Sequence, residues 1–225
     1  SEASVPENSI QVASASTSDA DGDSLTLSLS GDDAVKFSIN QNTGALTFTT
    51  APNFESPSDA NSDNSYRVTV TVSDGTDQAS QAVTVSVTDV NETPVITAVN
   101  SEVPASSGFT SVSAAEGQTS AFNVTASDPE SDSLSYSISG VDGSLFSINS
   151  EGVVTFKSAP DYEIPLDSDG DNIYAMTVTA ADAQYSDSVA VQVTVTDAQE
   201  GISGVLLDGY LAGSTVFQDI NNNGI

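Results

Sequence analysis

The chain has 225 residues, of which 32 are Asp or Glu and only 3 are Lys or Arg, so its formal net charge at pH 7 is −29. This charge repels nucleic acid, anionic membrane surfaces and acidic polymers, and it favours divalent cations as partners. Cys and His are both absent, which excludes disulfides, thiolate and imidazole metal sites, and every catalytic nucleophile that depends on a Cys or a His. Only oxygen ligands remain for a metal, and they favour a hard cation such as Ca²⁺.

The length suits two domains that each bury a core. No apolar run in the sequence approaches the roughly 20 residues of a membrane span. The chain starts at Ser1 without a signal-peptide pattern, so we expect a fragment of a longer protein. Its richness in Ser, Thr, Asp, Asn and Gly, with almost no Lys, suggests an extracellular protein that bound Ca²⁺, rather than disulfides, would stabilise.

Short runs in which β-branched or apolar residues alternate with Ser or Thr predict an all-β chain, and no stretch shows sustained helical periodicity. Turn signals such as Asp21-Gly22 and Asp74-Gly75 separate the runs. In the first half, the pattern predicts strands near Ser9 to Ala15, Leu25 to Ser30, Phe37 to Asn40, Ala45 to Thr50, Tyr66 to Ser73 and Gln81 to Val90.

The second half of the chain repeats the first. Phe37-Ser38-Ile39-Asn40 returns 109 residues later as Phe146-Ser147-Ile148-Asn149, and Asn53-Phe54-Glu55 returns 108 residues later as Asp161-Tyr162-Glu163. Two copies of one module, each with about seven strands, predict tandem β-sandwiches. We expect a first repeat at 1–92, a second at 93–198, and the start of a third element or an ordered tail with a short β segment at 199–225.

Aromatic residues recur at matching positions of the two halves, which predicts that they belong to the two cores. They are Phe37, Phe48, Phe54 and Tyr66 in the first half and Phe146, Phe156, Tyr162 and Tyr174 in the second.

The acidic residues collect in the predicted loops. Four predicted strand interiors contain no Asp or Glu, namely 67–73, 82–88, 175–181 and 189–196. Adaptation to salt would also place acids on exposed strand faces, where this chain has Thr, Ser and Gln. The concentration in loops therefore favours cation binding at defined sites over general solvation.

A set of acidic motifs runs in order through the first half and ends in the linker Asp89-Val90-Asn91-Glu92-Thr93-Pro94. The earlier motifs are Pro6-Glu7-Asn8, Asp19-Ala20-Asp21, Asn53-Phe54-Glu55 and Asp74-Gly75. This order resembles the calcium-site pattern of cadherin repeats, and the module is similar to the bacterial cadherin-like repeat of large secreted or surface proteins over residues 1 to 198. The resemblance implies seven-stranded Greek-key sandwiches, of the cadherin and immunoglobulin-like kind, with Ca²⁺ at the junction between repeats.

The resemblance also implies a set of metal ligands at that junction. The first module would supply Glu7, Asn53, Glu55, Asp89, the backbone carbonyl of Asn91, and Glu92; the second would supply Asp128, Glu130 and Asp182, with Asp132 nearby. Asn53 stands where the family usually has Asp, Glu92 replaces the usual linker Asp, and Glu130 replaces the second Asp of a paired motif. These departures predict fewer ions or weaker affinity than in a full site.

Three further acidic groups are candidate metal sites. A half-built site that would face a preceding repeat contains Asp19, Asp21, Asp23 and Asp74, and the base of the second module contains Glu116, Asp161, Glu163 and Asp197. The loop Asp167-Ser168-Asp169-Gly170-Asp171-Asn172 has alternating oxygen ligands and a central Gly, which is typical of a cation-binding loop. The alternative is a solvated turn held by Asx hydrogen bonds, and Asp59 to Asn64 is a poorer copy.

Together these features predict a calcium-binding structural and adhesive module of a large extracellular or cell-surface protein, of bacterial origin, in which Ca²⁺ rigidifies the interdomain junction. Its expected partners are neighbouring repeats of the same chain and other cell-surface proteins or polysaccharides. The alternative is calcium-dependent carbohydrate binding by the domain doublet. An acid–base hydrolase is disfavoured because the acids occur in repeated loops with metal-like spacing and not as a unique pair.

Overall fold

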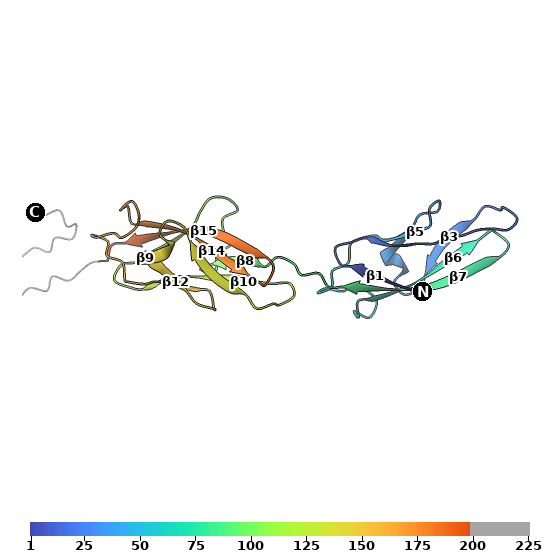
Figure 1. The fold of residues 1–225 in the computed structure, drawn as a ribbon, viewed down its shortest axis with the longest axis horizontal. Coiled ribbons are helices and arrows are strands. Elements are labelled where there is room, and N and C mark those ends of the chain that lie inside the picture. Colours follow the sequence, from blue (N-terminus) through green and yellow to red (C-terminus); the bar gives the residue numbers. More distant parts are fainter. Residues whose placement is uncertain (199–225) are drawn as a thin grey trace, which may run out of the picture. The chain divides into compact units, whose positions relative to one another are not determined.

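The computed structural model describes residues 1–198, which divide into a first unit, Ser1–Glu92, and a second unit that begins at Thr93 (Figure 1). Each unit is a β-sandwich of two sheets. Among the described residues the only helical elements are two 3₁₀ turns, η1 (Ala34–Lys36) and η2 (Gly143–Leu145), and no helix is long and apolar enough to cross a membrane. The predicted fold class of two tandem all-β sandwiches is confirmed; the predicted C-terminal segment at 199–225 lies outside the described residues.

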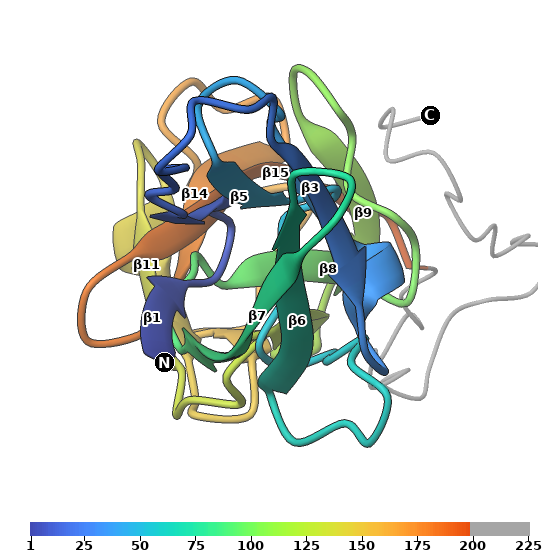
Figure 2. The same ribbon diagram turned by 90° about the vertical axis from the view of Figure 1, so that its right-hand side faces the viewer.

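The first unit has seven strands. They are β1 (Glu2–Pro6), β2 (Gln11–Ser14), β3 (Thr26–Ser30), β4 (Phe37–Ile39), β5 (Ala45–Phe48), β6 (Ser65–Ser73) and β7 (Gln78–Thr88). One sheet has the order β1-β7-β6-β3, with its long central strands side by side in Figure 2, and the other has the order β2-β5-β4. The pair β1 and β7 is parallel, while β6 and β7 are antiparallel.

The second unit has eight strands. They are β8 (Val95–Val99), β9 (Thr110–Ala115), β10 (Ser120–Ser127), β11 (Ser135–Ser139), β12 (Phe146–Ile148), β13 (Val153–Phe156), β14 (Ile173–Ala181) and β15 (Ser186–Thr196). The two sheets have the orders β12-β13-β10-β8 and β11-β14-β15-β9. The additional strand is β8, which pairs antiparallel with β10, whereas β9 pairs parallel with β15 as β1 does with β7.

Strands lie at or beside all six positions predicted for the first half, but β1 was not predicted. Its sequence, Glu2-Ala3-Ser4-Val5-Pro6, has one fully buried side chain, Val5, and three residues that disfavour strands, namely Glu, Ala and Pro. The strand forms because it pairs along the edge of β7 in register from Glu2 opposite Thr84 to Pro6 opposite Thr88. Pro6 is tolerated there because an edge position leaves its missing N–H unneeded.

An aromatic triad occupies the core of each unit. In the first unit the Phe37 and Phe48 rings stack with centroids 4.5 Å apart, and Tyr66 meets Phe48 edge-on at 5.0 Å. Phe146, Phe156 and Tyr174 repeat this arrangement in the second unit. Each such pair adds about 0.5–1.5 kcal/mol beyond the burial of its surface.

The two remaining aromatics predicted for the cores lie at their margins. Phe54 is half-buried, and Tyr162 is 39% exposed. Phe54 packs against the core of the first unit. The prediction is wrong for Tyr162, which is exposed and does not belong to the core cluster of the second unit.

Three carboxylates are buried at equivalent positions of each unit. They are Glu7, Asp33 and Asp59 in the first unit and Glu116, Asp142 and Asp167 in the second. A buried carboxylate is costly unless hydrogen bonds replace its hydration, and each of these six accepts two backbone N–H groups. They hold the loops in which the other acidic residues are presented.

Candidate metal centres

Glu7 is the centre of an acidic cluster at one end of the first unit. It follows β1 directly, and its side chain is 2% exposed. The backbone N–H of Phe54 donates to its Oε2 at 2.8 Å, and the N–H of Val90 donates to its Oε1 at 2.9 Å. One carboxylate thus joins the loop after β5 to the segment after β7.

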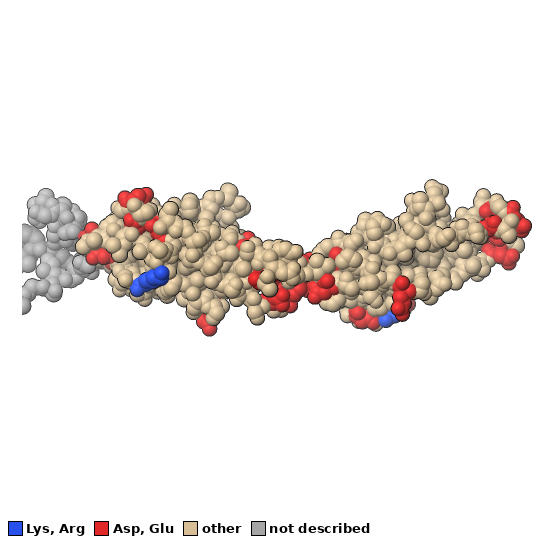
Figure 3. All heavy atoms as spheres, in the orientation of Figure 1, with Lys and Arg blue, Asp and Glu red and all other residues tan. Residues whose placement is uncertain are grey.

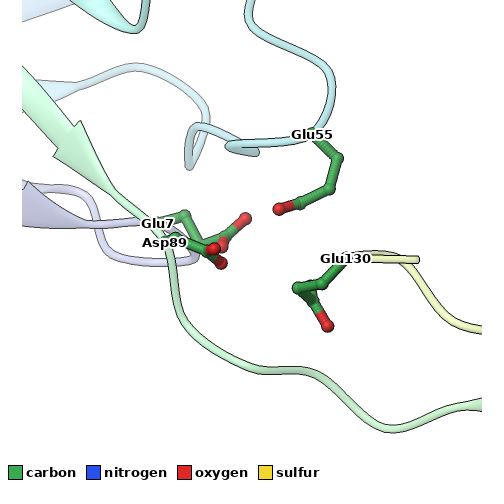
Figure 4. A group of neighbouring side chains, drawn as sticks. All are labelled: Glu7, Glu55, Asp89 and Glu130. Carbon is green, nitrogen blue, oxygen red and sulfur yellow. The ribbon is translucent and has the colours of Figure 1, made fainter. Parts of the chain in front are cut away.

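Glu55 and Asp89 approach Glu7 from those same two segments (Figure 4). Each of the three residues offers a carboxylate oxygen, and these oxygens all lie within 4.8 Å of one another. Oxygens bound to one Ca²⁺ lie about 2.3–2.6 Å from the ion, so oxygens this close can share one. Three carboxylates at this spacing also repel each other, by about 1 kcal/mol per pair at 4 Å in water.

The second unit repeats this cluster with Glu116, Asp161 and Glu163, whose carboxylate oxygens again lie within 4.8 Å of one another. Glu116 accepts the backbone N–H of Ala198 at 2.6 Å and that of Tyr162 at 2.8 Å. The hydrogen bond from Ala198 is the largest cause that lowers the pKa of Glu116 below its ordinary value, and the hydrogen bond from Tyr162 is the next. Burial acts in the opposite direction.

Several residues predicted as ligands at the bases of the two units form local hydrogen bonds. The Asn53 side chain accepts the N–H of Ser56, and that of Asp161 accepts the N–H of Ile164. Asn8 donates to the Glu92 carboxylate, and Asn91 donates to the Glu92 carbonyl.

Asp197 interacts with the Glu116 side chain, but it is outside the close group of three. Within residues 1–198, the groups compatible with a shared ion thus include Glu7, Glu55, Asp89, Glu116, Asp161 and Glu163 from the predicted base ligands.

The acids predicted at the opposite end of the first unit form hydrogen-bonded turns. Asp19 accepts the N–H groups of Asp21 and Asp23, at 2.9 and 3.0 Å. Asp74 accepts those of Thr76 and Asp77, and these two bonds lower its pKa. Asp19 and Asp74 line one hollow of about 400 Å³ together with Asp77, which was not predicted. A metal site formed by Asp19, Asp21, Asp23 and Asp74 stays a prediction.

The equivalent end of the second unit contains Asp128, Asp132 and Asp182. Asp128 Oδ1 accepts the N–H of Asp132 at 3.0 Å, while its Oδ2 is buried without a hydrogen-bond partner. Asp182 Oδ1 accepts the N–H groups of Gln184 and Tyr185. The predicted convergence of these residues and Glu130 with the acids of the first unit stays a prediction.

The loop between β13 and β14 brings Asp167, Asp169 and Asp171 together, with carboxylate oxygens within 4.8 Å of one another. Asp167 is buried and accepts the N–H groups of Asp171 and Asn172. A hydrogen bond with Asp167 and the charge of Asp171 raise the pKa of Asp169. Burial raises the pKa of Asp167, but hydrogen bonds, led by those from the N–H of Asp171 and the Asp169 side chain, lower it below its ordinary value.

The equivalent loop of the first unit lies beside a positively charged side chain, Arg67 of β6. Arg67 lies 3.0 Å from Asp63, and this contact, more than the hydrogen bond from Asn61, lowers the pKa of Asp63. In the second unit Ala175 replaces Arg67 and Asp169 replaces Asn61. The second loop therefore has one more carboxylate and lacks the neutralising guanidinium.

Asp33 and Asp142 were not predicted as important residues. Asp33 accepts the N–H groups of Ala60 and Arg67, both at 2.7 Å, and Asp142 accepts those of Ser168 and Ala175, both at 2.8 Å. Each fastens the acidic loop to the start of the following long strand. The sequence does carry a signal for these two residues. Each is an Asp two positions after a Gly, and the two Gly–Asp pairs lie 109 residues apart, at equivalent positions of the two modules.

Acidic side chains appear as separate patches on the face drawn in Figure 3, in keeping with their concentration in loops. The chain thus combines a repeated acidic loop architecture with strand faces that carry few charges.

Comparison with protein families finds a similarity in the first unit. Residues 1–88 match the model of the bacterial Ig domain family. A search of curated proteins finds no match.

Solved structures with a similar fold include cadherin ectodomains. The chain is 24% identical to human protocadherin-24 EC1-2, form II, with a TM-score of 0.57 over 88% of this chain and 95% of that one. Against Drosophila N-cadherin EC1-4 the TM-score is 0.55 at 22% identity, over 87% of this chain and 47% of that one, so this chain spans about half of its length. Mouse cadherin-23 EC22-24 gives a TM-score of 0.51 at 20% identity, over 88% of this chain and 62% of that one. The predicted resemblance to cadherin-like tandem repeats is confirmed for the fold.

Proposed function

We propose that the chain is a calcium-binding structural and adhesive segment of a large extracellular protein, in which Ca²⁺ stiffens the connection between tandem modules. The observation that carries the proposal is the repeated cluster at the base of each module. Glu7, Glu55 and Asp89 form it in the first unit, and Glu116, Asp161 and Glu163 form it in the second.

The donor set suits Ca²⁺. Its ligands are carboxylate oxygens, the chain has no Cys or His to recruit a softer metal, and calcium accepts mono- and bidentate carboxylates at flexible angles. The bound ion would supply charge neutralisation, which removes the mutual repulsion of the cluster. The similarity to bacterial Ig domains and to cadherin ectodomains, which are typical extracellular modules, supports the proposed extracellular location.

The buried glutamate connects the metal cluster to the chain that leaves the module. Glu7 accepts N–H groups from the Glu55 loop and from Val90, the residue after Asp89. An ion held by these carboxylates would fasten the exit segment to the sandwich, so that the linker starts from a fixed position. Glu116 has the same relation to Ala198 in the second unit.

The loop with Asp167, Asp169 and Asp171 would form a separate site within the second module. Its three carboxylates lie close together, and the raised pKa of Asp169 reflects their mutual repulsion. The Arg67 of the first module provides in that loop the positive charge that an ion would provide here. The predicted sites at Asp19, Asp21, Asp23 and Asp74 would gain further ligands from a preceding repeat.

A calcium titration followed by calorimetry and by thermal unfolding tests the proposal. Ligand at 100 times its Kd stabilises a folded domain by about 2.7 kcal/mol per site, which for a domain of roughly 100 residues raises Tm by roughly 10 °C. We expect the double variant Glu55→Gln with Asp89→Asn to remove the response of the cluster at the base of the first unit. Asp161→Asn with Glu163→Gln should remove the response of the base cluster of the second unit and leave that of the Asp167 loop.

The matched control is Glu151→Gln, which removes an exposed carboxylate from a turn outside all clusters. It should leave both the Tm response and the heat of binding unchanged. Equal unfolding temperatures in excess Ca²⁺ and in chelator would show that the clusters are solvated acids, and the proposal would fail.

Calcium-dependent binding of carbohydrate stays a prediction from the sequence. Its test is co-sedimentation of the chain with insoluble polysaccharides in Ca²⁺ and in chelator. Co-sedimentation in Ca²⁺ but not in chelator would support it.

A further inference from the structure

The strands β3 and β11 form equivalent edges of the two sandwiches. Each is the last strand of its sheet and pairs on one side only, β3 with β6 and β11 with β14. Their registers match, because Leu27 lies opposite Val72 in the first unit and Tyr136 lies opposite Ala180 in the second. The two edges therefore present the same backbone groups, and a difference between them must come from the residues around each strand.

A side chain closes the edge of β3. The amide nitrogen of Gln41 donates to the carbonyl of Leu27 at 2.7 Å, and the amide oxygen of Gln41 accepts the N–H of Leu27 at 2.8 Å. These are the two hydrogen bonds that a further antiparallel strand would make at this position. Asp32, an exposed residue just beyond the strand, adds a negative charge to the same edge. Such features protect sheet edges from pairing with another chain.

The edge of β11 lacks both features. The turn after β12 is one residue shorter than the turn after β4, and Ser150 stands at the position of Gln41. Val141 replaces Asp32 and is 72% exposed. The whole stretch 133–141 contains no charged residue and no Pro. The second unit therefore presents an uncharged strand edge that nothing protects within the part of the chain that the structure describes.

The open edge carries backbone groups and apolar side chains that a further strand would cover. Backbone groups alternate between the two sides of an antiparallel strand, and the equivalence of Tyr136 to Leu27 places the N–H and carbonyl groups of Tyr136 and Ile138 on the side away from β14. No strand of the described residues pairs with that side. The side chains of Tyr136 and Ile138 pack against the core but are only partly buried, whereas Leu27 is 8% exposed.

We propose that β11 pairs antiparallel with β11 of a second copy of this chain and so forms a homophilic interface. A two-fold axis at Ser137 places Tyr136 of each copy opposite Ile138 of the other, where about four backbone hydrogen bonds form. The pairing also brings an aromatic side chain beside a β-branched one, which is a favourable combination across two strands. It extends the sheet of each sandwich into the other.

The charge distribution favours a second copy as the occupant of this edge. Copies with a net charge of −29 repel each other over their acidic loops, so close contact requires a region without acids, and the stretch 133–141 is such a region. Ser alternates with Tyr and Ile in β11, so the strand has nearly the same pattern in both directions. Identical antiparallel strands therefore match small residues with small and large with large. A basic segment of another protein would instead be attracted to the acidic loops.

Sedimentation equilibrium of the full chain in chelator, at an ionic strength that screens the net charge, tests the proposal. We expect the apparent mass to rise with concentration from that of one chain toward that of two. Amide exchange at Tyr136 and Ile138 should slow over the same range, whereas exchange at Leu27, which Gln41 already protects, should not change. A monomer at all concentrations, or a dimer without protection of Tyr136 and Ile138, would overturn the proposal.

Opposite charges on the two-fold axis identify the contact. Ser137 is exposed and lies beside its own counterpart in the proposed pair, so Ser137→Lys and Ser137→Asp each place like charges opposite each other. Each variant alone should weaken association by about fivefold or more, and an equimolar mixture of the two should restore it. The matched controls are Ser28→Lys and Ser28→Asp, at the equivalent exposed position of β3, which should leave association unchanged. Equal weakening by the controls, or no recovery in the mixture, would overturn the two-fold pairing.

The interface uses no residue of the acidic clusters, so its failure and that of the proposed calcium binding are distinguishable. A monomer whose Tm rises in Ca²⁺ would overturn the interface alone. A dimer in chelator whose Tm does not respond to Ca²⁺ would support the interface without the calcium sites. Association that requires Ca²⁺ and disappears in the double variant Glu55→Gln with Asp89→Asn would assign the contact to the acidic clusters and overturn its assignment to β11.

Discussion

At the scale of single residues, buried carboxylates organise each module. Asp33 and Asp142 each accept two backbone N–H groups and connect an acidic loop to a long central strand. The aliphatic and aromatic core was predictable from the repeat, but these anchors were not. An Asp in an acidic sequence gives no local sign that it is buried among backbone donors.

We predict that Asp142→Asn destabilises the second unit by about 2–3 kcal/mol, because an amide retains one acceptor oxygen and leaves a buried N–H unsatisfied. Asp33→Asn should have the same effect on the first unit. Urea unfolding measures both changes. The control is Asp32→Asn, an exposed neighbour, and an equal loss of stability in that variant would show that charge, not hydrogen bonding, is responsible.

Glu116 gives a prediction for the pH dependence of stability. Its pKa is lowered in the folded state, mainly by the N–H of Ala198 and then by that of Tyr162. The stability that it contributes is therefore present above its unfolded-state pKa and is lost as the pH falls through the lower folded-state value. In chelator, Glu116→Gln should flatten the acid limb of the stability curve of the second unit; an unchanged limb would contradict this origin.

At the scale of elements, the two acidic loops occupy equivalent positions in the two modules but differ in their charged side chains. The loop at 59–64 lies beside Arg67, and the loop at 167–172 lies beside Ala175 and has one more carboxylate. Their equivalence was predictable from the alternating acids and the spacing. The effect of Arg67 was not, because its contact with Asp63 depends on the path of β6 next to the loop.

We predict that Ala175→Arg with Asp169→Asn gives the second loop the behaviour of the first. Calcium should shift the amide resonances of residues 167–172 in the parent chain, and this shift should disappear in the variant while the response near Glu116 remains. Loss of both responses would indicate a general effect of charge. Persistence of the loop response would mean that the three carboxylates are not its cause.

Strands that show a local sequence pattern were predicted, whereas a strand that depends on pairing with a distant segment was not. Alternation predicted β2 to β7, because their inward residues recur every second position. The short strand β1 escaped prediction because its pairing with β7 joins segments about 80 residues apart. The acidic residues of the base clusters were predictable as repeated motifs, but the buried state of Glu7 and its two backbone donors required the fold.

At the scale of the whole molecule, the net charge of −29 destabilises the compact folded state through self-repulsion. The acids are confined to loops, so neutralisation at a few clusters would remove a large part of the local repulsion. Monovalent salt screens such charges without holding their oxygens in place. Calcium at millimolar concentration should therefore stabilise the chain more than the same ionic strength of NaCl, as thermal unfolding would measure.

The most direct test of the central claim is small-angle X-ray scattering of the chain in excess Ca²⁺ and in chelator, with the double variant Glu55→Gln and Asp89→Asn alongside. We predict a longer and more rigid particle in Ca²⁺ for the parent chain and no such change for the variant. Identical scattering of the parent chain in both conditions would contradict the claim that calcium stiffens the junction, even if calcium raises the stability of the separate modules.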